Sequence, residues 1–240
     1  NIVLVEKNYI ASGATGKAAG TLVLRGEIDL MDLIKRHGVD EAAKKWQQIH
    51  EDFKSIKKIV NDENIDCDAE PQDTLYCGFR HKSYNDLDME YEAEKILETT
   101  TKFLKNAELK KELNTNLFTH GILSANHGFS VNPLKLTQNL SKVIEKKYGV
   151  KIYENTTFLG EEKNTAKTHH GRIHYKKLIL AVDINYPSEM IKNLKSTIII
   201  TPPLTQEELA KTGMDRKKIV FDAKKSYDYF KVTKDNRFLF

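Results

Sequence analysis

Cysteine is scarce in this sequence. The 240 residues contain two, Cys67 and Cys77, with no Cys-x-x-Cys pair and no histidines at metal-ligand spacing. This pattern argues against a disulfide framework and against a zinc site, so we expect no bound metal. It favours a reducing compartment, and we predict a cytoplasmic protein.

Long apolar runs and a one-sided charge are also absent. No run approaches the roughly 20 residues that a membrane-spanning helix needs, and no signal-peptide core is visible. The net charge of +4 arises from 38 basic and 34 acidic residues, with lysine pairs scattered among acids. That mixture is typical of solvated helix faces. We therefore expect no transmembrane segment and no nucleic-acid partner.

The most informative stretch begins with the apolar, mostly β-branched run Ile2-Val3-Leu4-Val5. Such a run is typical of a strand buried on both faces of a parallel sheet, and Glu6 stands at its carboxyl end. In doubly wound nucleotide-binding folds, an acidic residue at the tip of the second strand accepts hydrogen bonds from ribose hydroxyls. Residues 11–20 are mostly small and include three glycines, which lets the backbone approach a ligand closely.

Each feature alone has a simpler interpretation, because apolar tetrapeptides and small-residue loops are common. Their order and spacing, V-L-V-E-K-x-x-I-A-S-G-A-T-G-K-A-A-G-x-L, resembles the second strand and flavin loop of the D-amino-acid oxidase superfamily of FAD-dependent oxidoreductases. The resemblance is to the branch with glycine oxidase, sarcosine oxidase and gamma-glutamylputrescine oxidase. It implies FAD as the cofactor.

The resemblance also implies that something precedes and follows these residues. Family members begin with a strand and a G-x-G-x-x-G turn, where the FAD pyrophosphate meets a helix N-terminus. Here the chain opens at Asn1 on the second strand and stops at Phe240, where the glycines of a family hairpin would begin. We expect a fragment of a longer protein, inactive on its own.

A second stretch resembles the family block in which the chain returns from the substrate domain to the FAD domain. Asn132 can cap a helix that begins at Pro133 and ends before Gly149, and a strand at 150–154 follows. The family block implies that the backbone of Phe158 lies against the adenine. A βαβ element of any α/β protein is the alternative.

We expect residues 177–181 to form another buried strand, whose end, Ala181, lies beside the dinucleotide in the family pattern. Asp183 departs from that pattern, since a small neutral residue is expected there. The residues implied in cofactor binding are Glu6, Lys7, Ser12, Gly13, Ala14, Thr15, Gly16, Lys17, Ala18, Ala19, Gly20, Thr21, Phe158 and Ala181.

Periodicity predicts the elements between these stretches. Helical spacing covers residues 26–60 with a break at Gly38, and Trp46 falls on an apolar stripe that indicates core packing. Residues 61–73 are polar and indicate a turn region, and residues 74–80 alternate as a strand.

The next two segments are more polar. Residues 84–113 favour a helix, and residues 161–172 favour a polar hairpin with His169 and His170 at its tip. Asp235-Asn236 is a good turn pair within a second hairpin.

The predicted fold class is α/β. A Rossmann-like FAD-binding lobe of residues 1–28 and 125–185 is interleaved with a mixed-sheet α+β substrate-binding lobe of residues 29–124 and 186–240.

Three residues are candidates for binding the substrate. Tyr76, Tyr229 and Lys231 lie on strands that resemble the family's substrate-domain sheet, and alternation places Tyr229 and Lys231 on one face. They are otherwise ordinary sheet residues on a solvated surface. No catalytic residue can be named.

The predicted function is oxidation of a small-molecule amine or amino acid by hydride transfer to flavin, with oxygen or another electron acceptor. Two alternatives stay open. One is a truncated or degenerate relative without flavin or activity, and the other is a flavin dehydrogenase of a hydroxy acid.

Overall fold

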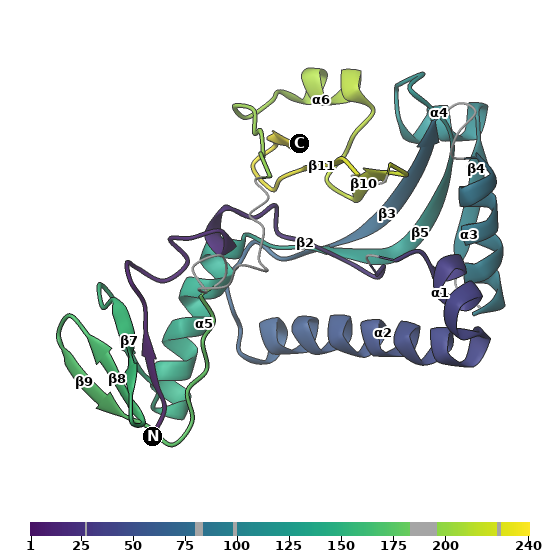
Figure 1. The fold of residues 1–240 in the computed structure, drawn as a ribbon. Coiled ribbons are helices and arrows are strands. Elements are labelled where there is room, and N and C mark those ends of the chain that lie inside the picture. Colours follow the sequence, from purple (N-terminus) through teal and green to yellow (C-terminus); the bar gives the residue numbers. More distant parts are fainter. Residues whose placement is uncertain (27, 80–83, 98–99, 183–195, 225–226) are drawn as a thin grey trace. The chain divides into compact units, whose positions relative to one another are not determined.

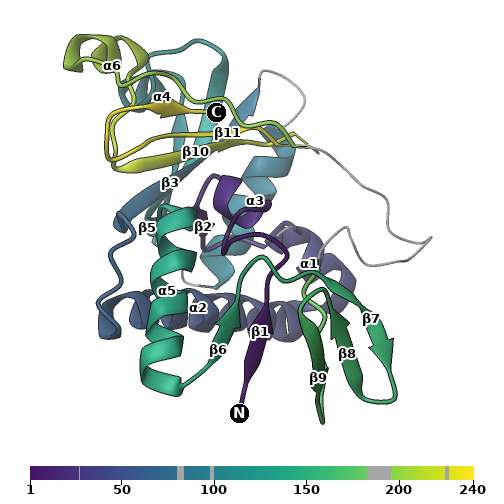
Figure 2. The same ribbon diagram turned by 90° about the vertical axis from the view of Figure 1, so that its left-hand side faces the viewer.

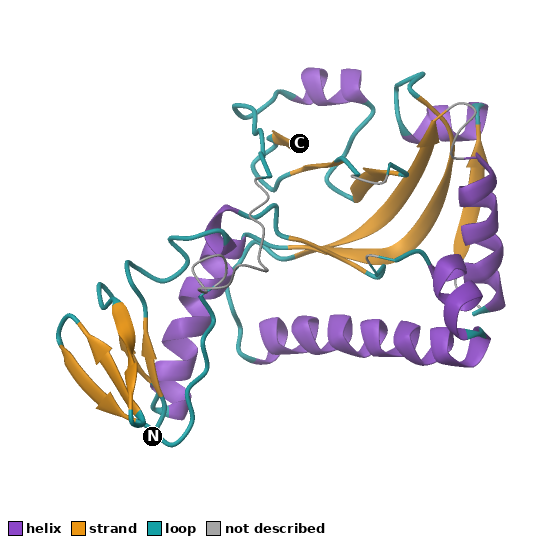
Figure 3. Cartoon of the chain, in the orientation of Figure 1, coloured by secondary structure: helices purple, strands orange, loops and turns teal. Residues whose placement is uncertain are grey.

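The computed structural model describes residues 1–240 except 27, 80–83, 98–99, 183–195 and 225–226 (Figure 1). The described residues form helices and sheets of a mixed α/β fold, which confirms the predicted class (Figure 3). The chain divides into two compact units. Unit 1 consists of Asn1–Ala18 and Pro133–Thr197, and unit 2 of Ala19–Asn132 and Ile198–Phe240. The assignment of lobes to cofactor and substrate stays a prediction.

Unit 1 contains a parallel strand pair, one long helix and a small antiparallel sheet. The pair joins β1 to β6, with Leu4 opposite Ile152. Helix α5 begins at Pro133 as predicted, and Gly149, at φ +65°, ends it. The antiparallel sheet has the order β7-β8-β9, with a turn at His169-His170. The elements are β1 (Val3–Val5), η1 (Thr15–Lys17), α5 (Pro133–Tyr148), β6 (Lys151–Tyr153), β7 (Phe158–Glu162), β8 (Thr165–Thr168) and β9 (Gly171–His174).

Two predictions of burial in unit 1 are wrong. Val3 and Leu4 are 39% and 36% exposed, because β1 lies in a sheet of two strands rather than between layers. Residues 177–181 form no strand, and Ile179 is 88% exposed. An apolar run becomes buried only where other elements pack over it. The pattern of apolar residues in the sequence does not show which elements will do so.

Unit 2 is built on a seven-stranded sheet with the order β12-β11-β10-β3-β5-β2, in which β4 also pairs with β5. Strands β10 and β3 are parallel, and the other neighbours are antiparallel. Figures 1 and 2 show its arrangement. The strands are β2 (Thr21–Val23), β3 (Glu70–Phe79), β4 (Thr101–Lys105), β5 (Phe118–Ser130), β10 (Lys218–Asp222), β11 (Tyr229–Val232) and β12 (Phe238–Leu239).

Five helices accompany this sheet in the described part of unit 2. They are α1 (Leu30–His37), α2 (Val39–Asp62), α3 (Tyr84–Ile96), α4 (Ala107–Glu112) and α6 (Gln206–Thr212). Helix α2 lies beside the part of the sheet that contains β2, β3 and β5 (Figure 1). The centroid of its Phe53 ring is 6.4 Å from that of Phe129 in β5.

The main core of unit 2 lies between the sheet and helices α4 and α6. It contains Leu75, Val220 and Val232 of the sheet, all fully buried, with Leu109 of α4 and Leu209 of α6. Each such side chain contributes about 1.5–3 kcal/mol relative to exposure.

A second cluster joins helices α1, α2 and α3. It includes Trp46 at 7% exposure, next to Leu30 and Leu33 of α1 and Ala93 of α3. The predicted packing role of Trp46 is therefore confirmed.

The structure corrects two element boundaries in unit 2. Strand β3 begins at Glu70 inside the predicted turn region, and it accommodates Pro71 because that residue is exposed and next to a register shift between Gln72 and Thr74. Residues 84–113 are not one helix, since β4 separates α3 from α4. The β-branched run that leads into β4 was the available signal.

Candidate functional site

Glu6 lies at the carboxyl end of a parallel strand pair, as the sequence predicts. Its N–H donates to the carbonyl oxygen of Tyr153 at 2.9 Å, which extends the β1–β6 pairing by one step. Its Oε1 accepts a hydrogen bond from the N–H of Asn8 at 2.9 Å. Ligands of open α/β sheets bind beyond the carboxyl ends of the strands, so this carboxylate stands where a nucleotide would be met.

The small-residue loop that follows is compact and mostly open to solvent. Gly13, Ala14 and Thr15 are exposed. A Cβ at Gly16 would lie 2.1 Å from the carbonyl oxygen of Ala11, so the fold of this loop requires glycine at that position. An open loop of small side chains fits close approach by the phosphates or ring of a dinucleotide.

A carboxylate from another element fixes the start of this loop. Oε1 of Glu154, which follows β6, accepts the N–H of Ile10 at 2.7 Å, and Ala11 adopts φ +65°. The predicted cofactor residues Lys7, Phe158 and Ala181 lie in the same unit, the last of them exposed and outside any strand. Their binding of FAD stays a prediction.

The end of the predicted cofactor segment belongs to unit 2. Ala19 is buried, Gly20 has φ +65°, and Thr21 is the first residue of β2, paired with Ser130 of β5. Asp183, which departs from the family pattern, lies outside the described residues.

The three predicted substrate residues share one face of the unit 2 sheet. Phe221 of β10 is paired with Tyr76 of β3 on one side and with Tyr229 of β11 on the other, and paired residues point to the same face. The Tyr76 and Phe221 rings are stacked with centroids 5.0 Å apart. Lys231 lies two positions beyond Tyr229 on the same face. The register therefore brings Tyr76, Tyr229 and Lys231 together around an aromatic row.

Lys231 is not on a solvated surface. The residue is only 2% exposed. Its Nζ donates to Oγ of Ser130 at 2.5 Å and to the carbonyl oxygen of Gly20 at 3.3 Å. Burial lowers the pKa of Lys231 to about 8, against the opposing charge of Glu70. Lys231 thus connects β11 to β5 and to the end of the small-residue loop.

Sequence reasoning missed a charged cluster on this face. The Arg25 guanidinium lies 3.9 Å from the Tyr76 ring centroid and 5.8 Å from that of Phe221. It pairs with Asp29 at 2.8 Å, Glu90 at 2.9 Å and Glu94 at 3.2 Å.

The carboxylates of this cluster are held by helices α1 and α3. Glu90 also accepts the N–H groups of Leu30 and Met31 at 2.9 Å, at the start of α1. Burial raises the pKa of Glu94 to about 7, although Arg25 acts in the opposite direction. The signal in the sequence is the spacing of Glu90 and Glu94, which at i and i+4 share one helix face.

The Arg25 cluster carries an excess of negative charge. One guanidinium against three carboxylates leaves the cluster a charge of minus two when all are ionised, and minus one when Glu94 is protonated. Lys231 on the same face is a cation below its pKa of about 8 and offsets one of these negative charges. A face with an excess of carboxylates next to two aromatic rings attracts cations.

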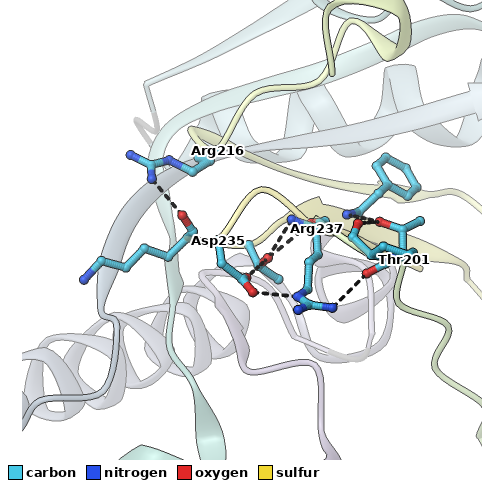
Figure 4. Close-up of polar contacts among 8 residues, drawn as sticks. Thr201, Arg216, Asp235 and Arg237 are labelled. Atoms are coloured by element: carbon cyan, nitrogen blue, oxygen red, sulfur yellow. Dashed lines mark hydrogen bonds and ion pairs between the residues drawn. The ribbon is translucent and has the colours of Figure 1, made fainter. Parts of the chain in front are cut away.

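Polar contacts within the hairpin of β11 and β12, and from it to Thr201 and Arg216, order its turn (Figure 4). Oδ2 of Asp235 accepts from Nε of Arg237 at 2.6 Å, and Nη1 of Arg237 donates to the carbonyl oxygen of Thr201 at 3.3 Å. Nη1 of Arg216 donates to the carbonyl oxygen of Lys234 at 3.0 Å. Asn236 has φ +62°, which confirms the predicted turn.

The described residues contain no group of three or more metal-ligating side chains that could hold a metal ion. Among their helices, none combines the length and the apolar composition needed to cross a membrane.

Curated proteins of similar sequence cover the whole chain. Gamma-glutamylputrescine oxidoreductase of Escherichia coli is 24% identical over 250 residues, and probable oxidoreductase OrdL of Haemophilus influenzae is 26% identical over 257. The chain spans 58% of the length of each of these relatives.

Solved structures share the fold. L-proline dehydrogenase from P. horikoshii aligns to 99% of this chain with a TM-score of 0.68 and 17% identity, over 62% of its own length. Glycine oxidase from Geobacillus kaustophilus aligns to 99% with a TM-score of 0.67 and 14% identity, over 63% of its length. At these identities the likeness shows the fold alone.

One protein family matches the whole chain. The model described as FAD dependent oxidoreductase matches residues 1–240. The match includes Glu6 and the loop after it, and it includes the sheet of unit 2. The chain therefore belongs to the FAD dependent oxidoreductase family.

Proposed function

We propose that the protein is an enzyme that oxidises an amine or amino acid by hydride transfer to FAD, with oxygen or another molecule as electron acceptor. One observation carries the proposal. In a chain that matches the family throughout, Glu6 directly follows β1 of a parallel pair, and the open small-residue loop comes soon after it in the chain. One of the similar sequences is named for gamma-glutamylputrescine, and one of the similar folds for glycine.

The cofactor residues would act by position. Glu6 would accept hydrogen bonds from ribose hydroxyls, the segment from Ser12 to Thr21 would admit the dinucleotide to its backbone, and Phe158 and Ala181 would offer backbone contacts. Bound FAD would supply the hydride acceptor. The chain's own contribution is to bind, orient and exclude water.

The electrostatics of unit 2 favour an amine over a hydroxy acid. A protonated amine is a cation, and the Tyr76–Phe221 pair beside Arg25 has an excess of carboxylates. A hydroxy acid has no ammonium group to meet these carboxylates, whereas an amine or an amino acid has one. We propose that Tyr76 and Tyr229 line the substrate site. Lys231 would stabilise the site through its hydrogen bonds to Ser130 and Gly20.

The thiols support a reducing compartment. Cys67 and Cys77 are buried and form no disulfide, and burial raises the pKa of the Cys77 thiol above its usual range. We propose a cytoplasmic location on this basis.

The test is the visible absorption spectrum of the full-length gene product that carries residues 1–240. Flavin bands that bleach anaerobically when an amine or amino acid is added, and persist with 2-hydroxy acids, would support the proposal. Bleaching by hydroxy acids alone would favour the dehydrogenase alternative. A colourless protein that takes up no added FAD would favour an inactive relative.

A further inference from the structure

Helix α2 and neighbouring residues of unit 2 border two adjoining hollows that are open to solvent. One has a volume of about 460 Å³ and the other of about 440 Å³. Both are lined by His50 and Lys54 of α2, which makes them neighbours along the helix. Leu24 and Asn126 line the first, and His127 of β5 lines the second. None of these residues is among those assigned to flavin or substrate.

The first hollow is positively charged. Lys54, Lys57 and Lys58 line it at helical positions i, i+3 and i+4, and Asp62 is the one carboxylate in its lining. Three lysines against one aspartate leave two positive charges. Lys58 pairs with Asp62, whereas within the described residues neither Lys54 nor Lys57 pairs with a carboxylate.

Aromatic side chains hold one of these cations in place. The Nζ of Lys57 lies 5.2 Å from the ring centroid of Phe53 and 5.4 Å from that of Phe129. These contacts stabilise an ammonium group without neutralising its charge. The positive charge therefore remains available to a ligand in the hollow.

His50 adds a buried polar atom with no protein partner. Its Nε2 is shielded from solvent and makes no hydrogen bond. Burial and the neighbouring Lys54 lower its pKa, so the ring is neutral at pH 7 and one ring nitrogen carries a proton to donate. A buried polar atom without a partner is destabilising, and a turn of the His50 ring toward the hollow would let an acceptor atom of a ligand satisfy it.

The second hollow has an apolar wall. Trp46 and Leu97 line it, with the Trp46 and His50 rings 5.5 Å apart between centroids. His127, the other histidine there, has its pKa lowered to about 4 by burial and by His50, with Asp73 opposing, so it is neutral as well. Together the two hollows form a groove with lysines at one end and Trp46 at the other.

We propose that this groove is a binding site for a small organic anion, with its carboxylate or phosphate head at Lys54, Lys57 and His50 and its apolar body against Trp46. The site makes no use of the flavin and stands independently of the proposed oxidation. The shared chemistry is a negatively charged oxygen head on an apolar body.

Trp46 provides the readout, because it lies in the wall of the site. The protein is titrated with phenyl phosphate, with phenylacetate and with the neutral phenylacetamide, and binding is followed by tryptophan emission and by calorimetry. Saturable quenching and heat with either anion, and not with the amide, are the expected result. The tighter of the two anions identifies the head group. Equal binding of the amide, or no binding of either anion, would overturn the proposal.

Charge-removing variants locate the anion. K54Q/K57Q should weaken binding about tenfold, since two favourable charge interactions are lost. K45Q is the matched control, because Lys45 lies nine positions before Lys54 on the opposite side of the same helix and outside both hollows. The reporter control is W46F, which should keep the heat and lose the quenching. Unchanged affinity in K54Q/K57Q would contradict the assignment.

Discussion

The two units contain similar apolar strands in different surroundings. In unit 2, Leu75, Val220 and Val232 have no exposed surface, because helices α4 and α6 cover their face of the sheet. In the described part of unit 1, the buried apolar residues are Ile10 and Ala166.

The difference separates two properties that a sequence pattern joins. An apolar β-branched run favours an extended backbone, and it forms a strand wherever a partner strand is available. Burial requires a second layer as well, and in unit 1 the run at β1 has a partner strand in β6 while Leu4 stays 36% exposed. Strand formation therefore requires suitable residues and one partner strand, whereas burial depends on how all the elements of the unit pack together.

Ion pairs should show the largest difference between the units. Replacing Arg25 by Met removes the cation from Glu90 and Glu94, whose side chains are 1% and 3% exposed. We expect unfolding of unit 2 at pH 8 to require about 3–5 kcal/mol less free energy. At pH 5 the loss should be smaller, since Glu94 takes up a proton below its pKa of about 7. Urea unfolding followed by circular dichroism measures both.

The matched change in unit 1 is Lys167 to Met. Lys167 and its partner Glu162 are 43% and 60% exposed, so losing this pair should change stability by less than about 1 kcal/mol. Equal losses in the two variants would contradict the difference in burial.

Apolar truncation should separate the units next. Leu75→Ala opens a cavity in the main core and should lower the free energy of unfolding by about 2–5 kcal/mol. Leu4→Ala, at a side chain already in contact with water, should cost about 1 kcal/mol or less. Urea midpoints of the two variants test this, and a Leu4 variant as unstable as the Leu75 variant would mean that β1 is covered.

Lys231 gives unit 2 a pH dependence of its own. Its folded pKa of about 8 lies below the ordinary value of 10.5, so between these two pH values the unfolded chain binds more protons than the folded one. Stability should therefore rise from pH 8 to pH 10.5, by up to about 3 kcal/mol. Lys231→Met should remove this rise when unfolding is measured in both proteins across that range. A rise that persists in the variant would assign it to another group.

A further comparison concerns two glycines in the loop of unit 1. Gly16→Ala places a Cβ 2.1 Å from the carbonyl oxygen of Ala11, and the shift it forces should cost about 1–3 kcal/mol and weaken flavin retention. Gly13→Ala is the control, because a Cβ there meets nothing within 4 Å. Flavin absorbance per protein after gel filtration is the measurement. Equal retention in both variants would remove the loop from the cofactor site.

Local chemistry in the sequence predicted several features well. Proline favours the first turn of a helix and glycine ends one, so the bounds of α5 at Pro133 and Gly149 were predictable. Asp235-Asn236 predicted its turn for the same kind of reason. Strand β4 was missed because five residues among charged neighbours form a strand through pairing with β5.

Some residues of the candidate site could likewise be predicted from the sequence, and others could not. Glu6 and the small residues after it were identifiable because a strand, its acidic end and its glycines are consecutive in the chain. The Arg25 cluster was not, since Glu90 and Glu94 lie 65 and 69 positions away and are brought to Arg25 by the packing of α3 against α1.

By itself, the sequence determined the family, and it determined the ends of α5, the Asp235-Asn236 turn and the position of the small-residue loop, which depend on neighbours within a few residues. The tertiary structure alone decided which apolar strands are buried, which face carries Tyr76, Tyr229 and Lys231 together, and where Lys54 of α2 and His127 line one hollow. The physical reason is that burial and charge proximity are properties of distances between elements, and the chain sets those distances only when its layers pack.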